Sequence, residues 1–115
     1  MRREPAVYLW EAEQAAGHVL DFTAGRTLAD LESDLLLSSA VERQLQNMGE
    51  ALAQLDRAFP AIAERIPKLA DIVGFRNILV HGYRDLDYAT VWMTITRDVP
   101  PLRTQLQALL REVAE

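Results

Sequence analysis

Apolar residues recur along most of the chain at spacings of three and four, which is the period of an amphipathic α-helix. The clearest run has successive spacings of four, four, three, four, three and four, and it consists of Leu37, Val41, Leu45, Met48, Leu52, Leu55 and Phe59. This run predicts a long helix over about 34–59. An earlier stripe predicts a first helix that ends near Gly25, and it consists of Tyr8, Ala12, Ala15, Val19 and Phe22, widened by Leu9, Ala16 and Leu20.

Local signals divide the middle of the chain. Thr27, followed three residues later by Asp30, is typical of a capping box that opens a short helical turn. Pro60 and Pro67 bracket a segment long enough for about one turn. The pattern then predicts a helix from Lys68 to about Gly82, with an apolar stripe of Ile72, Phe75, Ile78 and Leu79.

Two further helices are predicted toward the C-terminus. Asp85 is placed to cap one that directs Tyr88, Trp92 and Ile95 inward. The segment 90–96 is rich in β-branched residues, but a lone strand would have no partner, so a helix is favoured. Asp98 precedes two prolines whose missing amide protons suit a helix start, and the last apolar stripe follows as Leu102, Leu106, Leu109 and Val113.

Short connections between these segments make sequential helices antiparallel neighbours. We therefore predict an all-α fold, an antiparallel bundle of four to five helices in one domain over 1–115. The length of 115 residues is sufficient for one core and too short for two.

Composition narrows the functional classes. The chain has no cysteine, which excludes disulfides and thiolate metal sites, and its net charge of −5 does not favour a protein that binds nucleic acid with its whole surface. No apolar run approaches the roughly 20 residues that span a bilayer. We expect a cytoplasmic protein with no signal peptide and no membrane partner.

The segment 76–83 concentrates chemistry on the helix predicted over 68–82. Arg76 and Tyr83 lie seven residues apart on one stripe, and Asn77 and His81 lie four apart on the neighbouring stripe, so all four share one broad face. His81 suits proton transfer near neutral pH, and Arg76 offers a fork of donors for phosphate oxygens. This pair fits metal-free RNA cleavage, with His81 as base toward the ribose 2′-hydroxyl and Arg76 stabilising the attacked phosphate.

The other groups in this cluster admit several roles. Asn77 suits orientation of His81 or contact with a ribose hydroxyl, while Tyr83 suits base stacking, phosphate binding or acceptance of a transferred group. We expect neither a metal nor a cofactor, because one histidine lies here and Asp85 and Asp87 sit beyond Gly82. Structural roles compete: Arg76 as part of a solvated ion-pairing face, His81 as a helix C-terminal cation and Tyr83 as a core aromatic.

Residues outside the cluster are interpreted as structural. We expect Trp10 and Trp92 to pack rather than to stack on a ligand, and His18 to be a surface or structural residue. Four glutamates are expected to be solvated, and the one flanked by small residues stands out among them: Glu11, Glu13, Glu42 and Glu50.

The predicted helices carry more apolar surface than one core requires. Val73 and Val80 lie beside Arg76 and Asn77, away from the main stripe of their helix. Small and uncharged residues flank the stripe of the long helix at Leu36, Ala40, Gln44, Asn47, Ala51 and Ala58. These features favour a homodimer in which the same helices meet around a twofold axis. Such a dimer would bring a second His81 and Arg76 to one cleft.

The sequence resembles the HEPN domains, and within them the HepT-like toxins of toxin–antitoxin pairs. The decisive motif is RxxxxHxY, matched by Arg76, His81 and Tyr83. The resemblance covers nearly the whole chain, and its flanking blocks are Tyr8-Leu-Trp, Leu20-Asp-Phe-Thr-Ala-Gly25, Ser39-Ala-Val-Glu-Arg-Gln-Leu45, Gly49-Glu-Ala51 and Arg65-Ile-Pro67.

This resemblance implies a homodimeric, metal-independent ribonuclease with Arg76 and His81 as catalytic residues and Asn77 as their polar neighbour. It also implies a partner, an MntA-type nucleotidyltransferase antitoxin that uses ATP and magnesium to adenylylate Tyr83. An anionic adduct there would block the cleft and repel RNA. Two alternatives remain: a non-catalytic nucleotide- or partner-binding module of a nucleotidyltransferase complex, and a purely structural dimerisation module.

Overall fold

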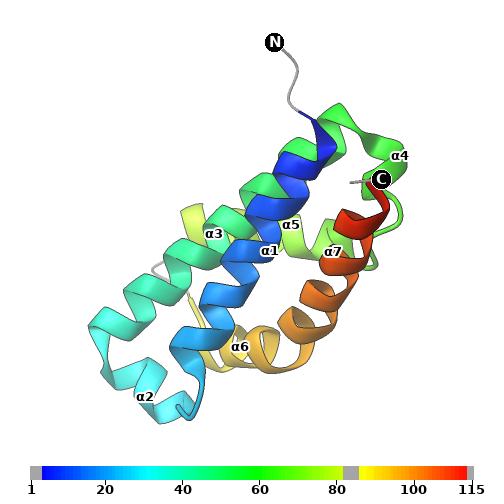
Figure 1. Ribbon diagram of the computed structural model, residues 1–115. Helices are drawn as coiled ribbons and strands as arrows, with labels where there is room; N and C mark the ends of the chain where they lie inside the picture. Colours follow the sequence, from blue (N-terminus) through cyan, green and yellow to red (C-terminus); the bar gives the residue numbers. More distant parts are fainter. Residues whose placement is uncertain (1–3, 82–85, 114–115) are drawn as a thin grey trace.

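The computed structural model describes residues 4–81 and 86–113, and every element in those ranges is helical (Figure 1). The elements are α1 (Pro5–Thr23), α2 (Leu28–Ser33), α3 (Leu35–Ala58), α4 (Pro60–Ala63), α5 (Leu69–His81), α6 (Tyr88–Met93), the π-helical turn η2 (Thr94–Asp98) and α7 (Val99–Val113). The predicted all-α class is confirmed. No helix in the described ranges has the length and apolarity that crossing a membrane requires.

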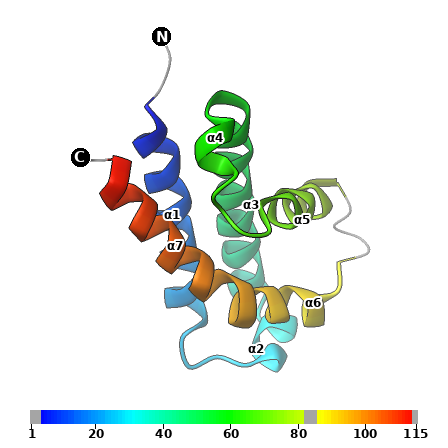
Figure 2. The same cartoon turned by 90° about the vertical axis from the view of Figure 1, so that its right-hand side faces the viewer.

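The core lies between α1, α3 and α7. The stripe predicted along α3 is confirmed, since its residues from Leu37 to Leu55 are all buried and Phe59 is half-buried at the end. On α1 the inner residues are buried as predicted, except that Leu20 is half-buried and Phe22 is exposed. α1 runs alongside α3, and α7 lies across α1 (Figure 2). One continuous apolar cluster joins these helices.

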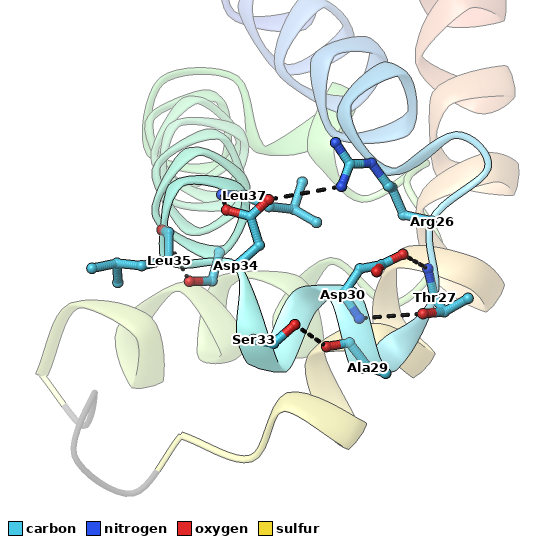
Figure 3. A network of polar contacts seen from close by, with 9 residues as sticks. Arg26, Thr27, Ala29, Asp30, Ser33, Asp34, Leu35 and Leu37 are labelled. Atoms are coloured by element: carbon cyan, nitrogen blue, oxygen red, sulfur yellow. Dashed lines mark hydrogen bonds and ion pairs between the residues drawn. The ribbon is translucent and has the colours of Figure 1, made fainter.

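Side-chain caps set the turn between α1 and α3 (Figure 3). The Thr27 hydroxyl accepts from the Asp30 backbone N–H at 3.2 Å, and the Asp30 carboxylate accepts from the Thr27 N–H at 2.9 Å. This is the predicted capping box. Asp34 then caps α3 by accepting from the Leu37 N–H at 3.2 Å, and its carboxylate lies 3.7 Å from Arg26. The antiparallel return of α3 along α1 follows from these contacts.

Residues 88–113 form one bent helix where two were predicted. The prediction of Asp98 as a helix cap is wrong, because Asp98 is the last residue of η2 and the chain continues directly into α7. The Val99 N–H bonds to the Thr94 carbonyl five residues earlier, which is a π-type turn. A proline ring collides with the carbonyl four residues earlier in a regular α-helix, and the wider turn accommodates Pro100 and Pro101 without ending the helix.

The start of α6 also differs from the prediction. Asp87 is the N-cap, and its carboxylate accepts from the Ala89 N–H at 3.0 Å. Asp85, the predicted cap, lies outside the described residues. The segment 90–96 is helical as favoured, and the Thr94 and Thr96 hydroxyls donate to carbonyls one turn earlier, at 3.0 and 2.9 Å.

α5 crosses α3 near the middle of α3, and α5 projects beyond α3 (Figure 2). Leu79 is buried against the core, while Ile72 and Phe75 are half-buried. Ile78 was predicted to belong to the same inward stripe, yet it is 53 % exposed. The stripe is narrower than predicted because α3 is the principal helix that α5 packs against.

Candidate functional site

α5 carries three of the four residues predicted for the site. Arg76 lies where α5 crosses α3 and is partly buried, whereas Asn77 and His81 are exposed. His81 is the last residue of α5. Tyr83 lies outside the described residues, so its predicted role stays a prediction.

Glu50 of α3 holds the Arg76 side chain. The guanidinium donates through Nη2 to the Glu50 Oε2 atom and through Nη1 to the side-chain amide oxygen Oδ1 of Asn77. A guanidinium has five N–H donors, so this arrangement leaves donors for a further anion. The structure therefore brings Arg76 and Asn77 together and adds a carboxylate to them.

Other side chains fix Glu50 in turn. Its Oε1 atom accepts from Gln54 at 3.0 Å and lies 3.8 Å from Arg57. The hydrogen bond from Gln54 is the largest influence on the pKa of Glu50 and lowers it; partial burial opposes this, and Arg76 and Arg57 lower it further. The net result is a pKa below the ordinary value of 4.5, so Glu50 is anionic at neutral pH.

A glycine permits the close contact between α3 and α5. A Cβ atom added at Gly49 would lie 2.8 Å from Arg76 Cγ and closer still to Arg76 Cβ. Those atoms are near the backbone of α5 and cannot swing away as the end of a long side chain could. Gly49 therefore sets the depth at which Arg76 sits over α3.

His81 lies farther along α5. Five residues separate it from Arg76, which corresponds to a rise of about 7.5 Å and a rotation of about 140° along an α-helix. Arg76 turns toward α3 and Glu50, while His81 faces away from the helix crossing into solvent. Within the described residues no hydrogen bond joins the two side chains.

Two glutamates that were expected to be solvated instead join helices, in addition to Glu50. Glu13 is buried and accepts from Arg103 at 2.9 Å and from Gln107 at 3.1 Å. Glu42 accepts from the Tyr88 hydroxyl at 3.0 Å. Burial is the largest influence on the pKa of Tyr88 and raises it.

The only sequence signal for Glu50 was its position between Gly49 and Ala51, because the local sequence pattern does not identify the helix that packs opposite Glu50.

The two tryptophans have different environments. Trp92 is half-buried and packs against the core, as expected. Trp10 is 56 % exposed on the outer side of α1, so its predicted packing role is wrong. Trp10 lies outside the buried stripe of α1, whose members include Leu9, Ala12 and Ala16. His18 is exposed, as expected, and stacks on Phe22 with ring centroids 5.9 Å apart.

The apolar surplus predicted beside the motif is present in part. Leu36 is 81 % exposed at the start of α3, and Val80 is exposed near the end of α5. Ile78 and Leu35 add to this exposed apolar surface. Of the other residues predicted to belong to it, Ala51 is buried within the chain's own core, and Gln44 and Asn47 line a groove between α1 and α3. In the described part of the chain, no three His, Asp or Glu side chains come together as metal ligands do.

The described helices form a bundle in which the helix that crosses α3 carries Arg76, Asn77 and His81, as expected for a helical domain of the HEPN type. The chain belongs to the ribonuclease HepT-like family, whose model matches residues 12–109. This range contains all of α3 and α5 and most of α1 and α7.

Several curated proteins are similar over nearly their whole length. A protein of Methanocaldococcus jannaschii named "Putative RNase" is 28 % identical over 108 residues, covering 92 % of this chain and 96 % of the relative. One of Caldanaerobacter subterraneus with the same kind of name is 28 % identical over 110 residues, covering 96 % and 97 %. A "Probable ribonuclease HepT" of Thermococcus cleftensis is 28 % identical over 109 residues, covering 95 % and 98 %. No solved structure matches the chain.

Proposed function

We propose that this protein is a metal-independent endoribonuclease, the toxin of a toxin–antitoxin pair. The observation that carries the proposal is the position of the Arg76 guanidinium, which Glu50 of α3 and Asn77 of α5 hold in place. Arg76 lies on α5, the helix whose last residue is the exposed His81. Membership of a ribonuclease family and the names of the relatives support it. An arginine fixed from two sides is a preorganised donor for charge that develops during reaction.

The proposed reaction uses one base and one cation. His81 takes the proton from a ribose 2′-hydroxyl, the 2′-oxygen attacks the adjacent phosphorus, and the bond from phosphorus to the 5′-oxygen breaks. The products are a 2′,3′-cyclic phosphate and a 5′-hydroxyl end. Arg76 stabilises the negative charge on the phosphate oxygens, and Asn77 orients the arginine.

The site is proposed to be composite. The departing 5′-oxygen needs a proton that one histidine cannot deliver in the step in which it accepts another. A second copy of the chain would supply a second His81 together with its Arg76. The exposed apolar residues Ile78 and Val80 on the motif helix and Leu36 on α3 support a homodimer through α3 and α5 that would bring the two motifs together.

Control by a partner completes the proposal. The Tyr83 hydroxyl lies two residues beyond His81 in the sequence and is proposed as the site of adenylylation by a nucleotidyltransferase antitoxin. The phenol oxygen would attack the α-phosphorus of ATP, and pyrophosphate would leave, with the antitoxin supplying ATP and magnesium. The resulting AMP group would occupy the crevice and repel RNA phosphates.

The test is cleavage of single-stranded RNA in excess EDTA by wild type, Arg76→Ala, His81→Ala and the matched surface control Arg111→Ala. We expect cyclic-phosphate ends with wild type and the control, and a strong loss of cleavage with the two motif variants. Wild-type RNA left intact, with Arg76-dependent binding of the antitoxin, would instead identify a non-catalytic partner-binding module. Normal cleavage by both motif variants would contradict the assigned residues.

A further inference from the structure

A groove of about 480 Å³ runs between α1 and α3 on the outer surface of the bundle. Trp10, Gln14 and His18 line its α1 side, and Gln44, Asn47 and Gln54 line its α3 side. Two buried alanines, Ala15 and Ala51, also line it and give it depth because their side chains are short. The two helices are antiparallel neighbours here (Figure 1). The residues that line the groove run from Trp10 to His18 on α1 and from Gln44 to Gln54 on α3.

The groove leads to the candidate site. Glu50 lines it, and the same carboxylate binds the Arg76 guanidinium from α5. A molecule lying in the groove would thus reach Arg76 by passing one side chain. No sequence-based prediction connected the α1 face with the motif.

The side chains of the groove suit unpaired nucleobases. Trp10 is 56 % exposed and presents an aromatic surface on which a base can stack. Gln44 and Asn47 form no side-chain hydrogen bond with the rest of the described chain, so their donors and acceptors are available. Amides that pair with base edges and aromatics that stack on base faces are the means by which proteins recognise single-stranded RNA.

Two arginines of α3 flank the groove, although neither is among the residues that line it. Arg43, Asn47, Glu50, Gln54 and Arg57 follow one another on α3 at spacings of four, three, four and three, so they share one face. An arginine therefore stands at each end of this face, about 21 Å apart at 1.5 Å per residue. The groove also contains Glu11 and Glu50, and Glu50 is paired with Arg76 and Arg57. The phosphates of a strand would lie near the arginines and its bases in the amide-lined middle.

We propose that this groove binds unpaired nucleotides next to the cleaved phosphate, with one base stacked on Trp10 and another read by Gln44 and Asn47. The proposal rests on the ribonuclease function proposed above and specifies its substrate: single-stranded RNA, recognised through its bases. A duplex keeps its bases stacked and paired, so it would not enter the groove.

Binding can be measured separately from cleavage. The chain has two tryptophans, so Trp92→Phe leaves Trp10 as the only one. This protein is titrated with single-stranded 2′-O-methyl hexanucleotides, which lack the attacking hydroxyl and stay intact, and with the duplex of the same sequence. We expect quenching of Trp10 fluorescence by the single strands and not by the duplex. In cleavage assays with RNA, Trp10→Ala should raise KM by about 5- to 150-fold, the range for loss of one stacked base, with kcat unchanged.

Control variants keep the outcomes distinct. Trp10→Phe should restore most of the affinity, and Met93→Ala, which removes an exposed apolar side chain on α6, should have no effect. Equal KM values for wild type and Trp10→Ala, or equal quenching by the duplex, would overturn the groove assignment while leaving the catalytic proposal intact. A Trp10 signal that changes with protein concentration alone would show that a second copy covers the groove, and would also overturn it. Strong Trp10-dependent binding without any cleavage of RNA would support the groove and contradict the catalytic proposal.

Discussion

Two arginine–glutamate pairs join helices of this bundle, and they share a design. Arg103 of α7 binds Glu13 of α1, and Arg76 of α5 binds Glu50 of α3. Each glutamate also accepts from at least one glutamine, and each arginine passes over a glycine of the helix that carries its glutamate. The pKa of both glutamates is below its ordinary value: for Glu13, burial raises the pKa most among single influences, but the combined hydrogen bonds from Arg103, Gln107 and Gln14 outweigh it.

The pairs differ in their exposure and in what the glycine contacts. The Glu13 side chain is 9 % exposed, whereas that of Glu50 is 37 % exposed. Gly17 faces the guanidinium end of Arg103, and Gly49 faces the base of the Arg76 side chain. The arginines do not differ in the same direction, since the Arg103 side chain is 35 % exposed and that of Arg76 is 26 % exposed. The contrast lies in the carboxylates: that of Glu13 is closed to solvent, whereas that of Glu50 stays open to solvent beside Arg76.

The largest expected effects come from removing each arginine in turn. Arg76→Ala should lower RNA cleavage by about 100- to 1000-fold, as loss of one preorganised donor does. Its stability should change by less than about 1 kcal/mol, because Glu50 is partly solvated and keeps Gln54 and Arg57. Arg103→Ala should leave the cleavage rate unchanged and lower the free energy of unfolding by about 2 kcal/mol, because a buried carboxylate loses its charged donor.

These two variants are compared by cleavage kinetics and urea unfolding on the same preparations. The comparison between the pairs fails if Arg103→Ala abolishes cleavage in a folded protein while Arg76→Ala does not affect it.

The two glycines offer a finer contrast. Gly49→Ala forces its new methyl group against the Cβ and Cγ atoms of Arg76. We therefore expect the free energy of unfolding to fall by about 1–3 kcal/mol, as is typical of overpacking, and RNA cleavage to be reduced. At Gly17 the Cβ would lie 3.0 Å from the terminal Nη2 of Arg103, which can move. Alanine favours a helix over glycine by up to about 1 kcal/mol, so Gly17→Ala should be neutral or slightly stabilising.

Thermal unfolding and the cleavage rate measure both effects. Equal destabilisation by the two substitutions would show that Gly49 has no special part in placing Arg76.

This contrast also marks what the sequence can and cannot predict. Periodicity predicted α3 and its buried stripe from Leu37 to Leu55, because one element's own pattern carries that information. It predicted the capping box at Thr27 for the same reason. The partners of Glu13 and Glu50 could not be predicted, since they come from helices 90 and 26 residues away in the chain. The error at Asp98 has a related origin, because tertiary packing of Ile95, Val99 and Leu102 keeps the helix continuous where local signals indicate a start.

The smallest effect expected is on the pH dependence of stability. A carboxyl group whose pKa is lower in the folded protein than in the unfolded chain binds fewer protons when folded, so unfolding takes up protons. The stabilisation is fully present above the ordinary pKa of 4.5 and is lost as the pH falls through the lowered folded values. Replacing either glutamate by glutamine should therefore flatten the loss of stability between neutral pH and about pH 3, with the larger change for Glu13→Gln because Glu13 is more buried. For Glu50→Gln the change should stay below about 1 kcal/mol, since solvent screens that pair. Urea unfolding at pH 7, 5 and 3 measures how the free energy of unfolding of each variant changes with pH. A larger change for Glu50→Gln than for Glu13→Gln would reverse the assignment of which carboxylate is closed to solvent.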